Sequence, residues 1–212
     1  MTVRILHFGT LVALLMCTFA CTSTVTQDGI TLTDEQAAKL DQPIVKINAM
    51  EERIKKSLAA LDYRRGSALL REIQFLVKIR ELAVPQIVER IPESAPRTQA
   101  SMLYVLGFAR SGPAGETLVR YLDDEDNVVR YEAAAGLLHH GDMAAIPVLM
   151  NFLEAKDKPF RYKAVQALRQ GTGKNFGYEF SAPAATRHAA LQRWQSWWEG
   201  EKGRLMVRSE KN

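Results

Sequence analysis

Apolar residues recur at an interval of 31 residues through the middle of the chain, and this repeat limits the fold more than any other feature of the sequence. The same four positions are apolar in three successive copies, so the apolar residues recur at equivalent positions and the repeat is more than a likeness between short stretches of sequence. The four columns are Ile87, Leu118 and Leu149; Ile91, Leu122 and Leu153; Met102, Ala133 and Ala164; and Leu106, Leu137 and Leu168. These columns predict a repetitive architecture.

Within each copy the apolar residues have helical spacing. Leu118 and Leu122 are four residues apart, so they lie on one face of a helix, and the same spacing recurs in the other columns. The best-formed copy predicts a first helix around 114–122 and a second around 127–139. The polar stretch "DDEDN" separates the two helices.

Residues that favour helix ends stand near these boundaries. Asp126 or Asn127 can accept hydrogen bonds from the backbone N–H groups that open the second helix. Gly112 and Gly141 are expected to close second helices, because glycine adopts the left-handed conformation most easily. Prolines are expected near the starts of first helices, where a missing N–H matters least. These prolines are Pro85, Pro113 and Pro147.

A two-helix unit of about thirty residues cannot bury its own apolar face, but stacked copies can share one. The sequence therefore predicts an all-α fold, an α-solenoid of stacked helix pairs over residues 33–171, with the clearest copies at 81–171. A further, degenerate pair is expected from Pro43 to Arg80, interrupted by Gly66. Its apolar stripes are Ile47, Ile54 and Leu61 on the first helix, then Leu69, Ile73 and Leu76 on the second.

The stretch "DDEDNVVRYEAAAGLLHHGDMAAIPVLMNFL" resembles a HEAT repeat, particularly the short HEAT-like type first described in phycobilisome lyases. The shared pattern is an acidic turn, Val-Arg, a small-residue helix that ends in Gly-Leu, then Gly-Asp and an apolar helix. The matching residues are Asp126, Val129, Arg130, Ala133, Gly136, Leu137, Gly141, Asp142, Ile146 and Leu149. The name of the lyases transfers no activity, because a shared fold is not a shared function.

Arg130 and Arg161 occupy the arginine position of that family, four residues after Asp126 and Asp157. Each arginine is expected to bond an acid or a helix-end carbonyl within the stack. Ala133 and its counterpart in the next copy are expected to be small because a neighbouring helix approaches closely there.

Tyr131 and Tyr162 follow the two arginines. The resemblance places them on the side of the second helix that tends to line the concave surface of HEAT solenoids. Together with Lys163 and Gln166 they are our candidates for contact with a protein partner. Half-buried packing is the alternative explanation for the two tyrosines.

The first 20 residues differ from the rest of the chain. Arg4 precedes an uncharged, mostly apolar run from Ile5 to Ala20, which is shorter than the roughly 20 residues that cross a bilayer comfortably. We therefore predict a signal peptide over residues 1–20. The run closes on "TFAC", which resembles the lipobox of bacterial lipoproteins, although Thr18 stands where that family usually has Leu.

The lipobox resemblance implies that Cys21 becomes the acylated first residue after cleavage at Ala20. Cys17 leaves with the signal, so Cys21 would otherwise be a single unpaired thiol in an oxidising compartment. The alternative is cleavage by a general signal peptidase, which yields a plain secreted protein. The stretch "TSTVTQDG" is small and polar, and residues 21–32 are expected to form a flexible tether. Thr22, rather than Asp, follows the cysteine and favours a periplasm-facing position on the outer membrane.

The 31-residue pattern ends after Leu168, and "GTGKNFGYEFSAPAATRHAALQRWQSWWEG" follows. This stretch resembles a segment that closes many bacterial HEAT-repeat proteins. We expect an aromatic loop and a Trp-rich helix over 172–200 that cap the last repeat, and a polar tail over 201–212. The alternative is an aromatic shelf that binds a sugar ring or a partner's aromatic side chain. Its residues would be Phe176, Tyr178, Arg187, Trp194, Trp197 and Trp198.

We expect no catalytic, cofactor or metal site. The histidines lack the i, i+4 partner or nearby cysteine of a zinc site, and His140 stands where the repeat usually has a buried Leu. The formal charge of +4 is interspersed with acids, so nucleic-acid binding is not expected. We expect a non-catalytic, membrane-anchored scaffold or assembly factor that binds protein partners in the bacterial cell envelope. The alternative is a lipoprotein that binds peptidoglycan or polysaccharide through the C-terminal aromatic segment.

Overall fold

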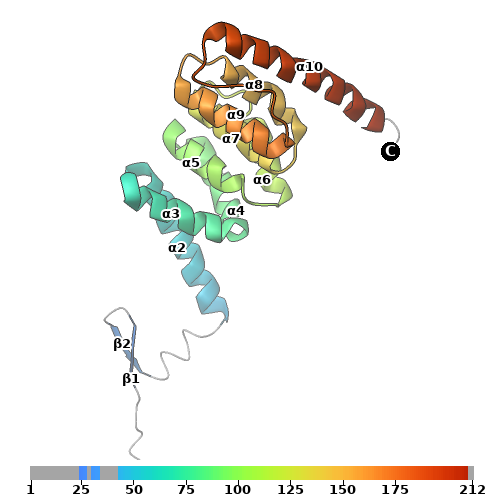
Figure 1. Ribbon diagram of the computed structural model, residues 1–212. Helices are drawn as coiled ribbons and strands as arrows, with labels where there is room; N and C mark the ends of the chain where they lie inside the picture. The colour runs from blue at the N-terminus through green and yellow to red at the C-terminus, as the bar shows by residue number, and fades with distance from the viewer. Residues whose placement is uncertain (1–23, 28–29, 34–42, 210–212) are drawn as a thin grey trace, which may run out of the picture. The chain divides into compact units, whose positions relative to one another are not determined.

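The computed structural model describes residues 24–27, 30–33 and 43–209, with side chains for 46–204 (Figure 1). The chain divides into two compact units, residues 1–49 and 50–212. The predicted signal peptide and Cys21 lie outside the described residues.

The first unit contains a short hairpin that the sequence analysis did not predict. Strand β1 (Thr24–Gln27) pairs antiparallel with β2 (Ile30–Thr33), and Val25 lies opposite Leu32. This pairing falls in the segment that was expected to be a tether without regular structure. The sequence between the strands is Asp-Gly, a pair common in two-residue hairpin turns, and this was the signal that the analysis passed over.

Helices make up the second unit, and they alternate as first and second members of pairs. They are α2 (Pro43–Tyr63), which begins in the first unit, α3 (Gly66–Lys78), α4 (Arg80–Arg90), η1 (Ile91–Glu93), α5 (Pro96–Leu106), α6 (Gly112–Arg120), α7 (Asn127–His139), η2 (Met143–Ala145), α8 (Ile146–Leu153), α9 (Lys158–Thr172) and α10 (Ala184–Ser209). The second helices are α3, α5, α7 and α9, and each packs on the next (Figure 1). The predicted all-α solenoid is confirmed, including the additional pair α2–α3.

The four apolar columns form the core of this stack. Their members are at most 1% exposed, except for Leu122, which is half-buried against the others. The first helices α4, α6 and α8 each pack on their own second helix, and α7 packs on α5, α6, α8 and α9. The apolar face of one pair is therefore covered by its neighbours, as the repeat requires.

The second helices α5 and α7 approach so closely that glycine is needed at their contact. A Cβ atom on Gly107 would lie 2.8 Å from the Cα atom of Gly136, and one on Gly136 would lie 3.0 Å from Leu118 Cδ2. Ala133 and Ala164 are fully buried in the same stack. Their burial agrees with the expectation that these alanines are small because a helix approaches, and that explanation stays a prediction.

The predicted helix ends are right in part. Asp126 caps α7, and its carboxylate accepts hydrogen bonds from Val128 N (2.7 Å) and Val129 N (3.1 Å). Gly141 follows α7 with φ of 87°. Gly112 was expected to close a second helix, but it begins α6 instead.

The prolines also divide into two groups. Pro113 and Pro147 stand in the first turns of α6 and α8, as predicted. Pro85 was expected near a helix start but lies inside α4, because only Ile79 separates α3 from α4 and the helix begins at Arg80.

The repeated arginines hold the turns between first and second helices. Arg161 is 4% exposed, and its Nη1 donates to the carbonyls of Ala155 (2.7 Å) and Lys156 (2.6 Å). Arg130 donates to the equivalent carbonyls, those of Asp124 and Glu125. Carbonyl bonding was one of the two predicted arrangements and is confirmed; neither arginine pairs with the aspartate four residues before it.

A buried carboxylate joins α2 to α3. Glu72 Oε2 accepts hydrogen bonds from Ser57 Oγ (3.0 Å) and Arg53 Nη1 (3.0 Å), and Arg64 Nε lies 3.5 Å from Oε1. Burial raises the pKa of Glu72, but the hydrogen bonds and the two arginine charges outweigh burial and leave it below the usual value. The degenerate first pair is thus joined by an ionic network as well as by Ile54 and its apolar neighbours.

The last helix, α10, packs on α8. It continues to Ser209, so the segment expected to be a polar tail from residue 201 is helical over most of its length. Among the described residues, no helix combines the length and the apolar character that crossing a membrane requires.

The close approach of α5 and α7 predicts a specific sensitivity to one added methyl group. Gly107→Ala should lower the free energy of unfolding by about 1–3 kcal/mol, because the new Cβ meets backbone atoms that cannot move aside. Gly112→Ala is the control, since a Cβ there meets nothing within 4 Å, and we expect a change within about 0.5 kcal/mol. Urea unfolding followed by circular dichroism measures both; equal effects would contradict the explanation.

Candidate protein-binding groove

Large apolar side chains are exposed on each of the four second helices. Leu70 on α3 is 57% exposed, Tyr104 on α5 43%, Val128 on α7 41% and Tyr162 on α9 46%. Exposed apolar residues also occur on the first helices, where Leu82 is 61% and Val119 49% exposed, so the hollows beside these four residues are what distinguish this face. This face is the natural place to look for a binding surface.

The same face is hollowed by two adjoining cavities. The α3 hollow, of about 840 Å³, is lined by residues of α3, α5, α7 and α9. The α9 hollow, of about 670 Å³, is lined by residues of α5, α7 and α9 and by the residues that directly follow α5 and α7. Tyr104, Glu132 and Lys163 line both hollows. We call the two together the second-helix groove.

Three columns of the 31-residue repeat supply 12 of the 27 residues that line the groove. Their spacing of i, i+3 and i+7 places them on one face of α3, α7 and α9, whereas Phe108 follows the end of α5. The columns are Leu70, Ser101, Glu132 and Lys163; Ile73, Tyr104, Ala135 and Gln166; and Val77, Phe108, His139 and Gln170. Unlike the core columns, these columns change chemistry from copy to copy.

The change along the groove has a direction. On α3 the three columns hold Leu70, Ile73 and Val77, which are all aliphatic. On α9 they hold a lysine and two glutamines. The groove is therefore apolar at its α3 end and rich in hydrogen-bonding groups at its α9 end.

An ion pair lies where the two hollows meet. Lys163 Nζ is 3.7 Å from Glu132 Oε1 and 5.3 Å from the ring centre of Tyr131. The Glu132 side chain is 15% exposed, and its burial raises the pKa of the carboxyl group more than the Lys163 charge lowers it. Glu132 and Lys163 therefore engage one another at the junction of the two hollows.

The structure brings all four predicted partner-binding residues to the α9 hollow. Tyr162, Lys163 and Gln166 are accessible there, and Gln166 Nε2 donates to Tyr162 Oη (3.3 Å). Tyr131 is only 8% exposed, and its hydroxyl donates to the carbonyl of Lys163 (3.3 Å). Its ring packs edge-on against Phe152, so packing accounts for most of its surface. Partner binding by these residues stays a prediction.

Sequence reasoning missed the α3 and α5 side of the groove. Leu70, Ile73 and Tyr104 were read as part of an apolar stripe or not singled out. The signal was available in the repeat, because columns that vary while their neighbours stay apolar are the outward columns. The columns that stay apolar in every copy predicted the core, but they did not predict the α3 and α5 residues of the groove.

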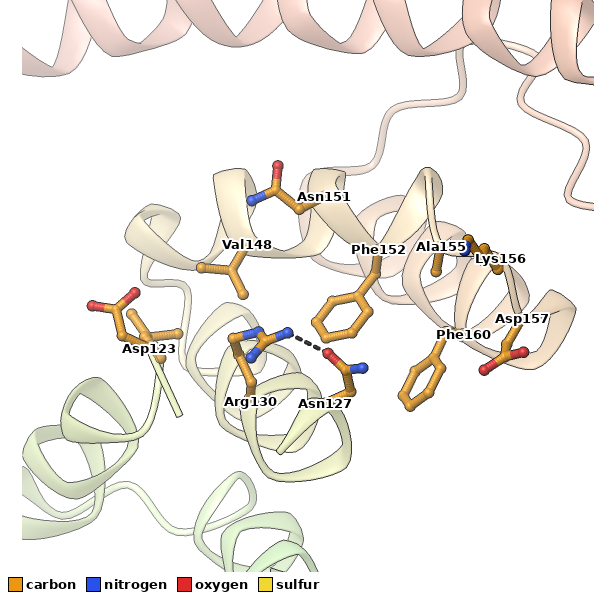
Figure 2. Close-up of a pocket in the computed structure, with 11 residues that line it drawn as sticks. Asp123, Asn127, Arg130, Val148, Asn151, Phe152, Ala155, Lys156, Asp157 and Phe160 are labelled. Atoms are coloured by element: carbon orange, nitrogen blue, oxygen red, sulfur yellow. Dashed lines mark hydrogen bonds between the residues drawn. The ribbon is translucent and has the colours of Figure 1, made fainter. Parts of the chain in front are cut away.

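A third hollow, of about 650 Å³, lies at the turns between first and second helices (Figure 2). Arg130 donates to Asn127 Oδ1 there, and its guanidinium lies 5.5 Å from the ring centre of Phe152. Phe152 and Phe160 are stacked with ring centres 5.3 Å apart. These groups already satisfy one another and fix the turn, so this hollow is a weaker candidate than the groove.

The C-terminal aromatic residues mostly face inward. Trp194 is fully buried, Tyr178 is 1% exposed and Trp198 is 8% exposed. The Tyr178 hydroxyl donates to the carbonyl of Leu153 at the end of α8. Phe176 meets Trp194 edge-on, with ring centres 4.7 Å apart. This geometry favours the capping role.

The other members of the predicted aromatic shelf offer a small surface. Phe176 and Trp197 are half-buried, and Arg187 Nη1 donates to the carbonyl of Ala182 (2.5 Å). A hollow of about 410 Å³ is lined by Tyr178 and Arg187, but none of the three tryptophans lines it. Use of this surface by a polymer stays a prediction.

The paired histidines join two repeats. His139 Nδ1 lies 2.7 Å from the carbonyl oxygen of Gly107, and His140 Nε2 lies 3.1 Å from that of Leu106. Burial lowers the pKa of His140, which is half-buried as expected. Across residues 46–204, no cluster of three or more histidine, cysteine or acidic side chains has an arrangement that could hold a metal ion.

The capping role of α10 predicts a large loss of stability from one substitution. Trp194→Ala should lower the free energy of unfolding by about 3–5 kcal/mol, because it leaves a cavity beneath the helix. Gln195→Ala, at an exposed position of the same helix, should change it by less than about 0.5 kcal/mol. Chemical unfolding of both variants provides the comparison, and an unaffected Trp194→Ala protein would rule out the cap.

Comparison with known families agrees with this geometry. The sequence profile of HEAT repeats matches residues 84–190, which span α4 to the beginning of α10. The comparison with curated proteins gives no match. HEAT repeats stack into solenoids that generally mediate contacts with other proteins. On the repeat register, the packed helix pairs and this match, the chain belongs to the HEAT-repeat family.

Proposed function

We propose that the protein is a non-catalytic scaffold or assembly factor that binds a protein partner in the second-helix groove at the bacterial cell envelope. The observation that carries this proposal is the groove itself, with an exposed apolar side chain from each of the second helices α3, α5, α7 and α9. Leaving these groups in water is unfavourable, and a partner that covers them gains about 25 cal/mol for each Å² of apolar surface removed from water.

The shape of the groove supports a protein partner over a small molecule. It extends over four helices and is open along its length, whereas small-molecule sites enclose most of their ligand. Its residues include Tyr104 and Tyr162, and tyrosine is among the residues that contribute most to protein interfaces. A scaffold role also agrees with the repeat family, which generally binds other proteins.

The proposed location rests on the N-terminal sequence. A single early positive charge, an apolar run and "TFAC" together support export and acylation of Cys21. An anchored chain that faces the periplasm, on the outer membrane, would display its groove to other envelope proteins. The polymer-binding alternative has less support, because Tyr178, Trp194 and Trp198 are buried.

Substitutions in the groove should separate binding from folding. Leu70→Ser combined with Tyr104→Ser should reduce partner recovery after crosslinking of the full-length chain at least about tenfold, because both side chains are exposed anchors. Leu82→Ser is the matched control, since Leu82 is 61% exposed on the first helix α4. Thermal unfolding should be nearly unchanged in both proteins. Equal recovery from the groove variant and the parent would contradict the proposed site.

The anchor is tested separately. Replacement of Cys21 by alanine should abolish incorporation of radiolabelled fatty acid into the chain, because the acylated thiol is removed. Cys17→Ala is the control, since that residue lies within the predicted signal and should leave labelling intact. Continued labelling of the Cys21→Ala protein would refute lipidation at this residue.

A further inference from the structure

The chemistry of the second-helix groove specifies its occupant more closely. We propose that the groove holds an amphipathic α-helix of the partner, with apolar side chains seated on α3 and α5 and acidic side chains beside Lys78 and Arg97. The inference rests on the proposed function, because it describes the partner bound at that same site.

A helical occupant follows from what the groove offers. An added strand needs the free backbone groups of a sheet edge, but the groove is lined mainly by helices, whose interior backbone groups bond to one another, and none of the residues that line it belongs to a strand. Recognition therefore has to use side chains. A helix presents apolar side chains in one stripe, and a hollow lined by Leu70, Ile73, Val77 and Tyr104 matches such a stripe.

The length of the groove fits a single helix. Packed helices lie about 8–10 Å apart, so the three steps from α3 through α5 and α7 to α9 cover roughly 24–30 Å. A helix rises 1.5 Å per residue, and about 16–20 residues span that distance. An ordinary helix of this size reaches from the apolar end of the groove to its polar end.

The charges of the α3 hollow favour acidic residues on the occupant. Lys78 and Arg97 line this hollow. Within residues 46–204 neither forms an ion pair, and Arg97 donates only to the carbonyl of Arg64, at 3.4 Å. The two acids that line the same hollow are already engaged, because Asp126 caps α7 and Glu132 pairs with Lys163. The α3 hollow therefore has two cationic groups available to a ligand.

The opposite end of the groove sets the orientation of the helix. Gln166 and Gln170 line the α9 hollow and provide neutral hydrogen-bonding groups. An apolar segment of the partner helix would bury less apolar surface in the α9 hollow than on α3. Acidic residues of that helix would also meet no unpaired lysine or arginine among the residues that line the α9 hollow. The apolar and acidic part of the occupant consequently lies over α3 and α5, and its polar part lies over α9.

Site-specific photo-crosslinking tests this inference. A benzoylphenylalanine replaces Leu70 or Tyr104 in the full-length, anchored chain, and a third protein carries it at Leu82 as the control position. Crosslinked partner segments are mapped by mass spectrometry. The mapped segment is then synthesised as a peptide, and its affinity is measured by fluorescence anisotropy against the parent chain and the Lys78→Glu/Arg97→Glu double variant, with circular dichroism confirming that the variant is folded.

We expect one segment of about 16–20 residues, crosslinked from Leu70 and Tyr104 but not from Leu82, with an apolar stripe and adjacent acids. The double variant should bind this peptide at least about tenfold more weakly, and the difference should shrink as salt rises, because the charges lie at an exposed rim. Changing the acids of the peptide to lysine should restore binding to the double variant.

The other outcomes separate the two proposals. A basic or uncharged segment captured at Leu70 and Tyr104, or an acidic one that binds the double variant undiminished, overturns the acidic helix but keeps the groove as a binding site. Absence of crosslinks from both groove positions, or equal capture from Leu82, overturns the proposed site and the inference with it.

Discussion

The rest of the structure depends on one constraint, which is that a single helix pair cannot cover its own apolar face. Each pair packs its apolar face against the next pair. The second helices α5 and α7 approach so closely that the backbones of Gly107 and Gly136 are nearly in contact. The contact leaves no freedom in the core columns, which stay apolar or small in every copy. The outward columns of the same helices carry no such requirement, so they can differ in chemistry, and these columns form the groove.

The sequence predicted the features that this constraint imposes in every copy. The period, the boundaries of α7 and the cap at Asp126 were found because they repeat or follow from local chemistry. The start of α4 could not be predicted in this way, because only Ile79 separates α3 from α4 and the repeat contains no signal for so short a connection. Residues 201–212 were predicted only to be a polar tail, so the helical course of residues 201–209 was not foreseen, although several of these residues favour helices.

Burial within the groove was also beyond what one repeat can reveal. Tyr131 and Tyr162 occupy the same position in two copies, yet the first is 8% exposed and the second 46%. Tyr131 has a following pair to pack on, and Phe152 and Phe160 of that pair surround its ring. Tyr162 belongs to the last pair, and its ring meets Phe180 of the aromatic loop. The repeat motif determines the position of a side chain on its helix, and the neighbouring repeat determines the exposed fraction of that side chain.

The position of the cap explains how the stack can be closed while its groove stays open. The last helix, α10, packs on α8, which is a first helix, and buries Trp194 there. The outward columns of α9 are not needed for this contact, so Lys163 and its neighbours remain exposed. A cap placed over α9 would have ended the groove at α7 and removed its polar end. Because the cap packs on the first-helix side, one bound partner can contact the whole groove, from its aliphatic end on α3 to its polar end on α9.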